Sequence, residues 1–299
     1  MSLLVVGSVA LDSVKTPFGE ATEVLGGSAT YFSIAASYFT EVRLVAVIGD
    51  DFPQQHIDLL KERGVHLGGL QKREGETFRW RGEYSHSLNE AKTLETRLNV
   101  FETFHPDLPP VYQDSDFVFL ANIDPELQCN VLTQIKHPKC VCCDTMNFWI
   151  SGKRKALQAT LEQVDMVIIN DGEARMVASD TNLVKAAQKI LKWGPKRVII
   201  KRGEYGVMMT DGATTFAAPA YPVENVFDPT GAGDSFAGGF MGYLAKTGKT
   251  DDATLRQAVI YGSVMASFNV EAFSVNGLRH LTQDAIHARY RQFQALMRF

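Results

Sequence analysis

One short segment combines glycines with a carboxylate in a pattern suited to phosphate chemistry: DPTGAGD, residues 228–234. Small residues let the backbone approach a ligand, and a helical pattern begins near Ala232. A glycine-rich turn that leads into a helix presents free N–H groups and the positive end of the helix dipole to an anion. Asp234 falls in the first helical turn, where a carboxylate can take the proton from a hydroxyl that attacks a phosphoryl group. The segment predicts a kinase, with Asp234 as general base and the backbone of Gly231, Ala232 and Gly233 as an anion hole. The alternative is a simple helix start, where Asp and Gly are common.

Alternating strand and helix patterns must position this segment. Strands are expected over residues 3–9, 43–49, 116–121, 139–144, 165–170 and 197–201, and helices over 28–39, 51–64, 232–245, 252–269 and 282–297. Such alternation predicts a mostly parallel sheet with helices on both faces. With no internal repeat or low-complexity linker, one domain over residues 1–299 is the economical interpretation.

Residues 70–99 break this rhythm. Residues 77–84 alternate with period two and no helix follows them, which predicts antiparallel strands outside the main sheet. Residues 85–99 are polar and lack a core pattern, as expected of a mobile element over a site. We expect an inserted β lid at about 70–99, with residues 13–25 as a candidate addition. An exposed lid edge could pair between subunits, so a homodimer through the lid is a candidate assembly.

Composition excludes several classes of function. The chain has 299 residues and a net charge of −4, so no overall positive field attracts nucleic acid or anionic membranes. The N-terminus lacks the pattern of a signal peptide, and no apolar run is long enough to span a membrane. The four cysteines suggest reduced structural thiols, which favours a cytoplasmic protein. The GSVAL string at residues 7–11 has one glycine where a dinucleotide-binding fingerprint needs three.

The DPTGAGD string, with SFAGGF directly after it, resembles the signature of the ribokinase-like (PfkB) carbohydrate kinase family. The resemblance spans nearly the whole chain. It implies an α/β fold of the ribokinase-like three-layer α/β/α type, with a mostly parallel central sheet and a small β lid. It also implies ATP as phosphoryl donor and Mg²⁺ as cofactor.

On the substrate side, the resemblance assigns Asp12, which follows the first strand, to gripping substrate hydroxyls. Gly26 and Gly27 match the family's di-glycine floor, where substrate lies against backbone. Taken without the resemblance, Asp12 is equally a turn residue and the glycines a loop-to-helix turn. Tyr31 stands where many sugar kinases have Asn, which suggests an acceptor ring of different shape, such as a base or a cyclitol.

Two further substrate contacts are expected. Asn147 lies in DTMNFW, residues 144–149, at the end of a strand, where relatives often carry Asp-Pro-Asn-x-Arg; the arginine is missing here. In the lid, Arg79 is a candidate ligand contact, the alternative being a solvated strand charge. Phe148 and Trp149 are expected to pack in the protein interior.

On the nucleotide side, Asn170 and Glu173 match the family's Asn-x-x-Glu motif, which implies that Glu173 binds Mg²⁺ through water. The same two residues fit a helix-capping box, and both roles are compatible. Lys201, Gly203 and Gly206 match a strand and a glycine-spaced turn beside the nucleotide, and Thr230 is assigned there as well. Relatives often hold a monovalent cation such as K⁺ near residues 228 and 273.

The sequence therefore predicts an ATP- and Mg²⁺-dependent kinase that phosphorylates a hydroxyl of a small sugar or sugar-like polyol. A nucleoside or inositol kinase on the same fold is the alternative. A non-catalytic module that binds a nucleotide or sugar is the more distant one.

Overall fold

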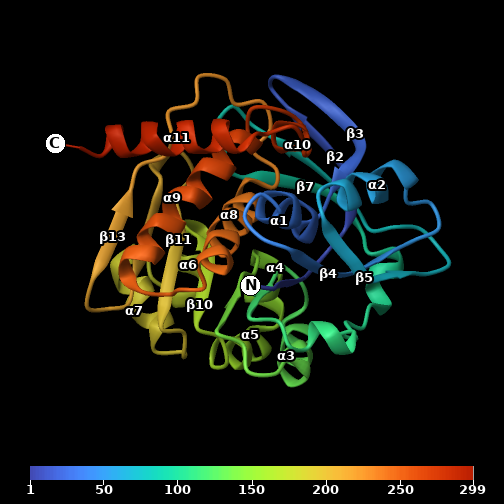
Figure 1. Cartoon of the computed structure of the whole chain (residues 1–299), viewed down its shortest axis with the longest axis horizontal. Coiled ribbons are helices and arrows are strands. Elements are labelled where there is room, and N and C mark those ends of the chain that lie inside the picture. The colour runs from blue at the N-terminus through green and yellow to red at the C-terminus, as the bar shows by residue number, and fades with distance from the viewer. Residues whose placement is uncertain (299) are drawn as a thin grey trace.

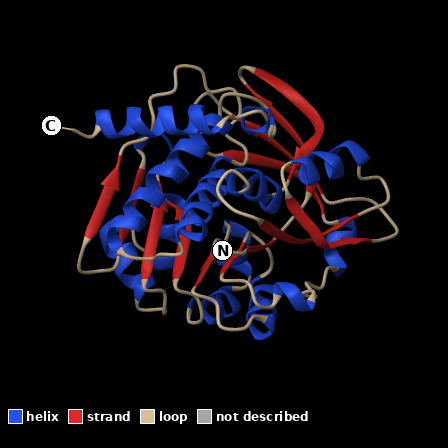
Figure 2. Ribbon diagram, in the orientation of Figure 1, coloured by secondary structure: helices blue, strands red, loops and turns tan. Residues whose placement is uncertain are grey.

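The computed structural model describes residues 1–298 and centres on a nine-stranded sheet (Figures 1 and 2). Its strand order is β13-β12-β11-β10-β9-β8-β1-β4-β5. The strands are β1 (Leu3–Val6), β4 (Val42–Ile48), β5 (Val65–Lys72), β8 (Phe117–Leu120), β9 (Cys140–Cys143), β10 (Met166–Asn170), β11 (Arg197–Lys201), β12 (Val207–Thr210) and β13 (Thr215–Ala218). Neighbours from β5 to β11 pair in parallel, and β12 and β13 pair antiparallel.

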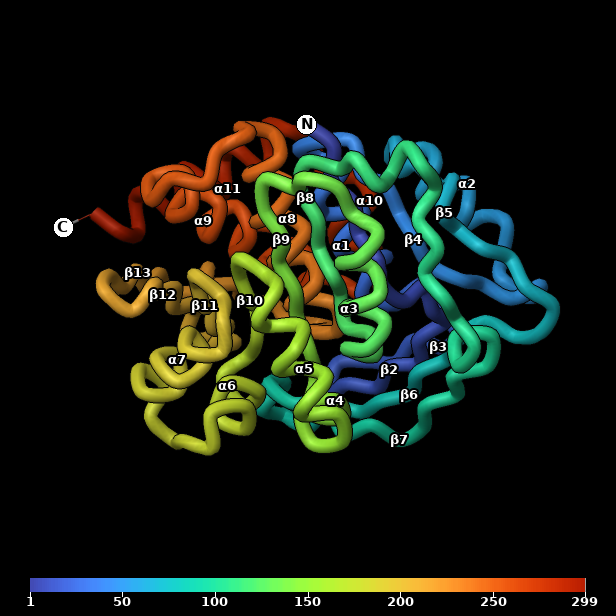
Figure 3. The backbone as a smooth tube through the Cα atoms, turned by 90° about the horizontal axis from the view of Figure 1, so that it is seen from below, coloured from blue at the N-terminus to red at the C-terminus, as the bar shows by residue number. Residues whose placement is uncertain are grey.

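Helices cover both faces of this sheet. On one face lie α1 (Ser28–Ala36), α2 (Gln54–Glu62), α8 (Ala232–Thr247), α9 (Asp252–Asn269), α10 (Asn276–Arg279) and α11 (Gln283–Leu296). On the other lie α3 (Pro125–Gln134), α4 (Asn147–Gly152), α5 (Arg154–Leu161), α6 (Asp171–Ala178) and α7 (Leu183–Leu191). Figure 3 shows α9 and α11 on one side of the sheet and α5, α6 and α7 on the other. This confirms the predicted ribokinase-like α/β/α arrangement.

Strand periodicity explains the two layers. In β1, Leu3 and Val5 pack in the core beneath α1 and α8, while Leu4 and Val6 pack in the core beneath α3 and α5. Successive strand residues point to opposite faces, so a strand buried on both sides is apolar throughout. The short helical turns η1 (Asn99–Thr103), η2 (Pro110–Tyr112) and η3 (Gly203–Tyr205) complete the connections.

A second sheet of four strands lies beside the first, in the order β3-β2-β6-β7 (Figure 3). Its strands are β2 (Ala10–Thr16), β3 (Gly19–Gly26), β6 (Arg79–Tyr84) and β7 (Ala91–Arg97). Residues within the predicted range 13–25 thus share this sheet with β6, and β6 pairs antiparallel with β7. The remaining pairing differs from the prediction, because β6 runs parallel to β2.

Two boundaries of the lid also differ from the prediction. Residues 70–72 continue β5 in the main sheet, where Leu70 pairs with Ala46, so the lid strands begin at Arg79. Residues 91–97 form a regular strand rather than an irregular element. Every residue of β7 is exposed at the edge of the sheet, which leaves no apolar alternation by which the sequence could reveal it. The assignment of the whole chain to one domain stays a prediction.

Candidate active site

The sheet topology gathers the polar residues at one edge. Because β1 is flanked by β4 and β8, the chain order reverses there, and in open α/β sheets ligands bind at the carboxyl ends of the strands beside such a point. Asp144 directly follows β9, while Asn170 and Lys201 end β10 and β11 and are paired in register. Helix α8 begins at the same place, beside α1 (Figure 1).

The glycine turn before α8 has the conformation that its sequence requires. Gly231 has φ of 74°, in the left-handed region that favours glycine, and a Cβ there would lie 2.3 Å from Cγ of Tyr31. A Cβ on Gly233 would lie 2.5 Å from Nζ of Lys201, so the lysine amine rests against the turn. The turn therefore places a positive charge and a helix N-terminus together.

One of the three predicted anion-hole donors is already engaged. The N–H of Ala232 donates to the carbonyl oxygen of Pro229 at 3.1 Å. Within the described part of the chain, the N–H groups of Gly231 and Gly233 have no hydrogen-bond partner. Because the turn from Pro229 to Ala232 uses the Ala232 N–H, only the N–H groups of Gly231 and Gly233 are left as candidate anion-hole donors.

Asp234 lies in a cluster of carboxylates around one lysine. Burial raises the pKa of Asp234 to about 6, and the Lys201 ammonium partly offsets this. Burial also raises the pKa of Asp144 well above its ordinary value, with the charge of Asp234 adding to the shift. The pKa of Glu173 is raised by burial as well, and Lys201 opposes that shift. The ammonium of Lys201 thus offsets the charge of three acidic side chains.

Asn170 and Glu173 form the helix-capping box that was one of their two predicted roles. The Asn170 N–H donates to Oε2 of Glu173, the Glu173 N–H donates to Oδ1 of Asn170, and both distances are 2.7 Å. The capping box does not use every acidic oxygen of the cluster. Within residues 1–298, Oδ1 of buried Asp144 has no hydrogen-bond partner. An orphaned carboxylate oxygen in an acidic cluster fits a divalent cation held partly through water. The described residues contain no group of three His, Cys, Asp or Glu side chains that could hold a metal ion.

The residues of the predicted substrate floor, Gly26 and Gly27, contact Asp12 in the four-stranded sheet. Asp12 is buried in β2, and its Oδ2 accepts the N–H of Gly27 at 3.3 Å. A Cβ on Gly26 would lie 1.9 Å from the same oxygen, so only glycine leaves room for the carboxylate. Burial raises the pKa of Asp12 to about 7, the Gly27 N–H lowers it, and the charges of Asp228 and Asp234 raise it further. Asp12 therefore faces the Asp234 side of the site.

Two tyrosines lie between these groups. Tyr31 is fully buried, with its ring against Gly231, and its hydroxyl has no partner among the described side chains. The enclosed ring is a support for the glycine turn and leaves no face for stacking on a base. Tyr84 ends β6, and its hydroxyl accepts a hydrogen bond from Thr230 at 3.2 Å. Burial raises the pKa of both phenols.

The remaining predicted contacts, Arg79 and Asn147, differ in how accessible they are. The Arg79 guanidinium is held by Asp51 at 2.7 Å and Glu23 at 2.8 Å, so it ties the lid to the end of β4 and is not free for a ligand. Asn147 starts α4 and is exposed. Phe148 beside it is 65% exposed, which corrects the expectation that it packs in the interior.

The loop between β6 and β7 reaches across to the nucleotide-side turns. A Cβ on Gly203 would lie 2.6 Å from Oδ1 of Asn89, and a Cβ on Gly172 would lie 4.0 Å from Oε1 of Glu90. Gly203 and Gly206 both have positive φ, of 53° and 85°. The loop therefore lies against the segments after β10 and β11, and Tyr84 at the end of β6 contacts Thr230.

Sequence reasoning missed Asp144, Tyr84 and Asn89 as site residues. Asp144 had a usable signal, since it directly follows a buried strand at the sheet edge. Period-two alternation in residues 77–84 did not distinguish the last residue of β6 from its neighbours, and nothing in the polar 85–90 loop marked Asn89.

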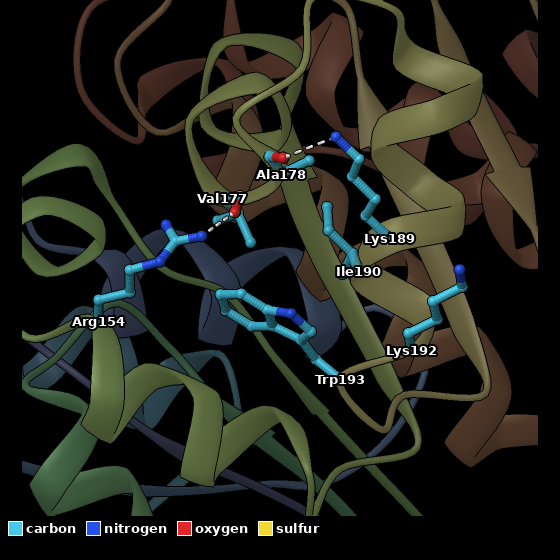
Figure 4. Close-up of a pocket in the computed structure, with 7 residues that line it drawn as sticks. All are labelled: Arg154, Val177, Ala178, Lys189, Ile190, Lys192 and Trp193. Carbon is cyan, nitrogen blue, oxygen red and sulfur yellow. Dashed lines mark hydrogen bonds between the residues drawn. The ribbon is translucent and has the colours of Figure 1, made fainter.

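A separate surface pocket of about 210 Å³ lies at the far end of α6 (Figure 4). Arg154 donates to the carbonyl oxygen of Val177 and covers the ring of Trp193, and Lys189 donates to the carbonyl oxygen of Ala178. Two of its three cations, Arg154 and Lys189, are thus engaged within the protein, and the pocket lies apart from the carboxyl edge of the sheet. Within residues 1–298, no helix is both long and apolar enough to cross a membrane.

A glycine turn at a helix N-terminus, a buried carboxylate and a lysine meet at the carboxyl edge of an α/β sheet, an arrangement suited to phosphoryl transfer. The sequence matches the pfkB family carbohydrate kinase description over residues 3–279, and the chain belongs to that family. It is accordingly a phosphotransferase. It is 32% identical over 247 residues to a cytidine kinase of Thermococcus kodakarensis, which covers 81% of this chain and 87% of that protein. A ribokinase of Lactococcus lactis is 25% identical and covers 91% of this chain and 92% of its own.

Solved structures share the fold. A nucleoside kinase of Burkholderia thailandensis in complex with inosine has a TM-score of 0.80 at 19% identity, covering 98% of this chain and 99% of its own. A ribokinase of Thermotoga maritima has a TM-score of 0.77 at 20% identity, covering 97% and 99%.

Proposed function

We propose that the enzyme transfers the γ-phosphoryl group of ATP to a hydroxyl of a nucleoside. The observation that carries the chemistry is the meeting of Asp234, the glycine turn and Lys201 at the carboxyl edge of the sheet. The identity to a cytidine kinase over most of both chains supports the nucleoside class. The sequence also left sugars and inositol open as acceptors, and the test below distinguishes them from nucleosides.

In the proposed mechanism, Asp12 accepts hydrogen bonds from acceptor hydroxyls and fixes the acceptor over the Gly26-Gly27 floor. Asp234 takes the proton of the attacking hydroxyl. The N–H groups of Gly231 and Gly233, together with Lys201, stabilise the charge that develops on the transferred group. Asp144 and Glu173 would hold Mg²⁺ through water, and the ion when bound neutralises phosphate charge.

The lid has the proposed task of excluding water. Asn89 and Glu90 lie against the nucleotide-side turns, and Tyr84 contacts Thr230 of the glycine turn. A closed lid would leave the acceptor hydroxyl as the available nucleophile. The exposed edge strand β7 also supports the proposed homodimer through the lid, which a monomer mass in solution would contradict.

We also propose a cytoplasmic location. All four cysteines are free thiols, and burial raises the pKa of Cys140, Cys142 and Cys143. Such thiols are inert structural groups that a reducing compartment preserves.

The test is ADP release from Mg·ATP with cytidine, adenosine, inosine, ribose, fructose and myo-inositol as acceptors. We expect a nucleoside to give the highest kcat/KM, at least tenfold above ribose. A free sugar or inositol as best acceptor would overturn the substrate class. Silence with every acceptor despite ATP binding would favour the non-catalytic binding module.

A further inference from the structure

A buried amide side chain joins the two ends of the glycine turn. Asn269 is the last residue of α9 and has none of its surface exposed. Its Nδ2 donates to the carbonyl oxygen of Thr230 at 2.7 Å, and its Oδ1 lies 3.2 Å from the hydroxyl of Ser235. Thr230 and Ser235 flank the segment that carries Gly231, Gly233 and the proposed base. One side chain from another helix therefore fixes both boundaries of that segment.

The bond to Thr230 also sets the direction of a proposed anion-hole donor. The peptide group is planar and trans, so the carbonyl of Thr230 and the N–H of Gly231 point in opposite directions. Because Asn269 holds that carbonyl, the Gly231 N–H is turned away from Asn269. The N–H of Gly231 is left without a hydrogen-bond partner in the described part of the chain. A donor fixed in advance costs no reorganisation when charge develops.

Near residues 228 and 273, where relatives often hold a monovalent cation, oxygens of this turn are hydrogen-bonded within the protein. Asp228 accepts the N–H of Thr230 on Oδ1 at 2.9 Å and the N–H of Ser274 on Oδ2 at 3.2 Å. The Thr230 carbonyl accepts Asn269, and the Val270 carbonyl accepts two backbone N–H groups. These four oxygens each receive at least one protein hydrogen bond, so the protein itself supplies positive polarity to them.

We propose that Asn269 is a positioning residue for phosphoryl transfer: it holds the anion hole in shape from within the protein, so that turnover needs no monovalent cation. The proposal rests on the proposed function. It deepens it by assigning to the end of α9 a role in the chemistry at the start of α8.

The test compares Asn269→Ala and the similarly sized Asn269→Leu, which has neither donor nor acceptor, with Ser267→Ala. Ser267 is a buried residue on the same turn of α9, and its hydroxyl donates to the carbonyl of Val264. We expect both Asn269 variants to lose about 100-fold in kcat, with acceptor KM within threefold of wild type. The Ser267 variant should keep wild-type kcat. Wild-type turnover should change less than twofold when K⁺ and Na⁺ are replaced by tetramethylammonium.

A binding measurement separates failure of this proposal from failure of the proposed function. Calorimetry with ADP and with the nonhydrolysable analogue AMP-PNP needs no acceptor. In Asn269→Leu we expect ADP affinity within twofold of wild type and a fall in the ratio of AMP-PNP affinity to ADP affinity. An unchanged AMP-PNP to ADP ratio with an intact fold, or a tenfold activation of the wild type by K⁺, would overturn the proposal. Absence of turnover with every acceptor, with the ratio altered, would instead count against the proposed kinase function and leave the role of Asn269 at the turn standing.

Discussion

Asp234 and Asp12 have pKa values near neutrality, about 6 and about 7, because burial disfavours their charged forms. Asp234 must be ionised to accept a proton, and Asp12 must be ionised to accept two hydroxyl hydrogen bonds. We therefore predict that kcat/KM rises with pH between 5 and 7.5 and is level above about 8. A pH profile on the best acceptor checks this. A flat profile from pH 5 to 8 would contradict the assignment of both carboxylates.

Replacement of Asp12 separates acceptor binding from chemistry. Hydrogen bonds to a charged group contribute about 1.5–3 kcal/mol each, so Asp12→Asn should raise the acceptor KM by about 10- to 100-fold. The KM for ATP should stay within threefold, because Asp12 lies on the floor formed by Gly26 and Gly27 and not beside Lys201. Steady-state kinetics with both substrates varied measures this. An increased KM for ATP with an unchanged acceptor KM would move Asp12 to the nucleotide side.

At the scale of elements, the loop between β6 and β7 spans the site. Asn89 reaches Gly203 and Glu90 approaches Gly172, so the loop covers the turns after β11 and β10. We predict that replacing residues 85–90 by two glycines lowers kinase activity at least tenfold and raises acceptor-independent ATP hydrolysis, because water enters the site. Lys92→Ala, an exposed change on β7 outside the loop, is the matched control. Unchanged hydrolysis in the shortened variant would show that the loop does not exclude water.

The fold was predictable where a signal is local. A few consecutive residues are enough to predict the DPTGAGD turn, the Asn170–Glu173 cap and the apolar parallel strands. The engaged N–H of Ala232 was not predictable, because its bond to Pro229 depends on the exact turn. The roles of Tyr84 and Asn269 were missed for another reason. Both side chains form hydrogen bonds with Thr230, which is distant in the sequence. A single sequence does not show which distant residues come into contact. The predicted start of the lid at residue 70 was wrong because residues 70–72 end β5. That edge strand is partly exposed and has no continuous apolar pattern.

At the scale of the whole molecule, the carboxylate cluster opposes stability. The pKa of Asp234 is raised from 3.8 to about 6, so the unfolded chain loses its proton first as pH rises. The free energy of unfolding therefore falls as pH rises through 6, and the folded protein carries a buried charge above it. Asp234→Asn removes that charge and should raise the free energy of unfolding at pH 8 by about 1 to 3 kcal/mol, with a smaller gain at pH 5. Urea unfolding at both pH values checks this.

The matched control for that measurement is Asp58→Asn, which changes an exposed carboxylate on α2. It should leave stability unchanged at both pH values. A gain from Asp234→Asn that is equal at pH 5 and pH 8 would rule out ionisation as its cause.

The central claim is that Asp234 is the base of a phosphoryl transfer, and single-turnover transfer from γ-labelled ATP to the best acceptor tests it most directly. Asp234→Asn keeps the size of the side chain and leaves the glycine turn and Lys201 in place. General-base catalysis is typically about 10²- to 10⁴-fold, so we predict a loss in that range with ATP affinity within threefold of wild type. Transfer at the wild-type rate by the Asn variant would contradict the account.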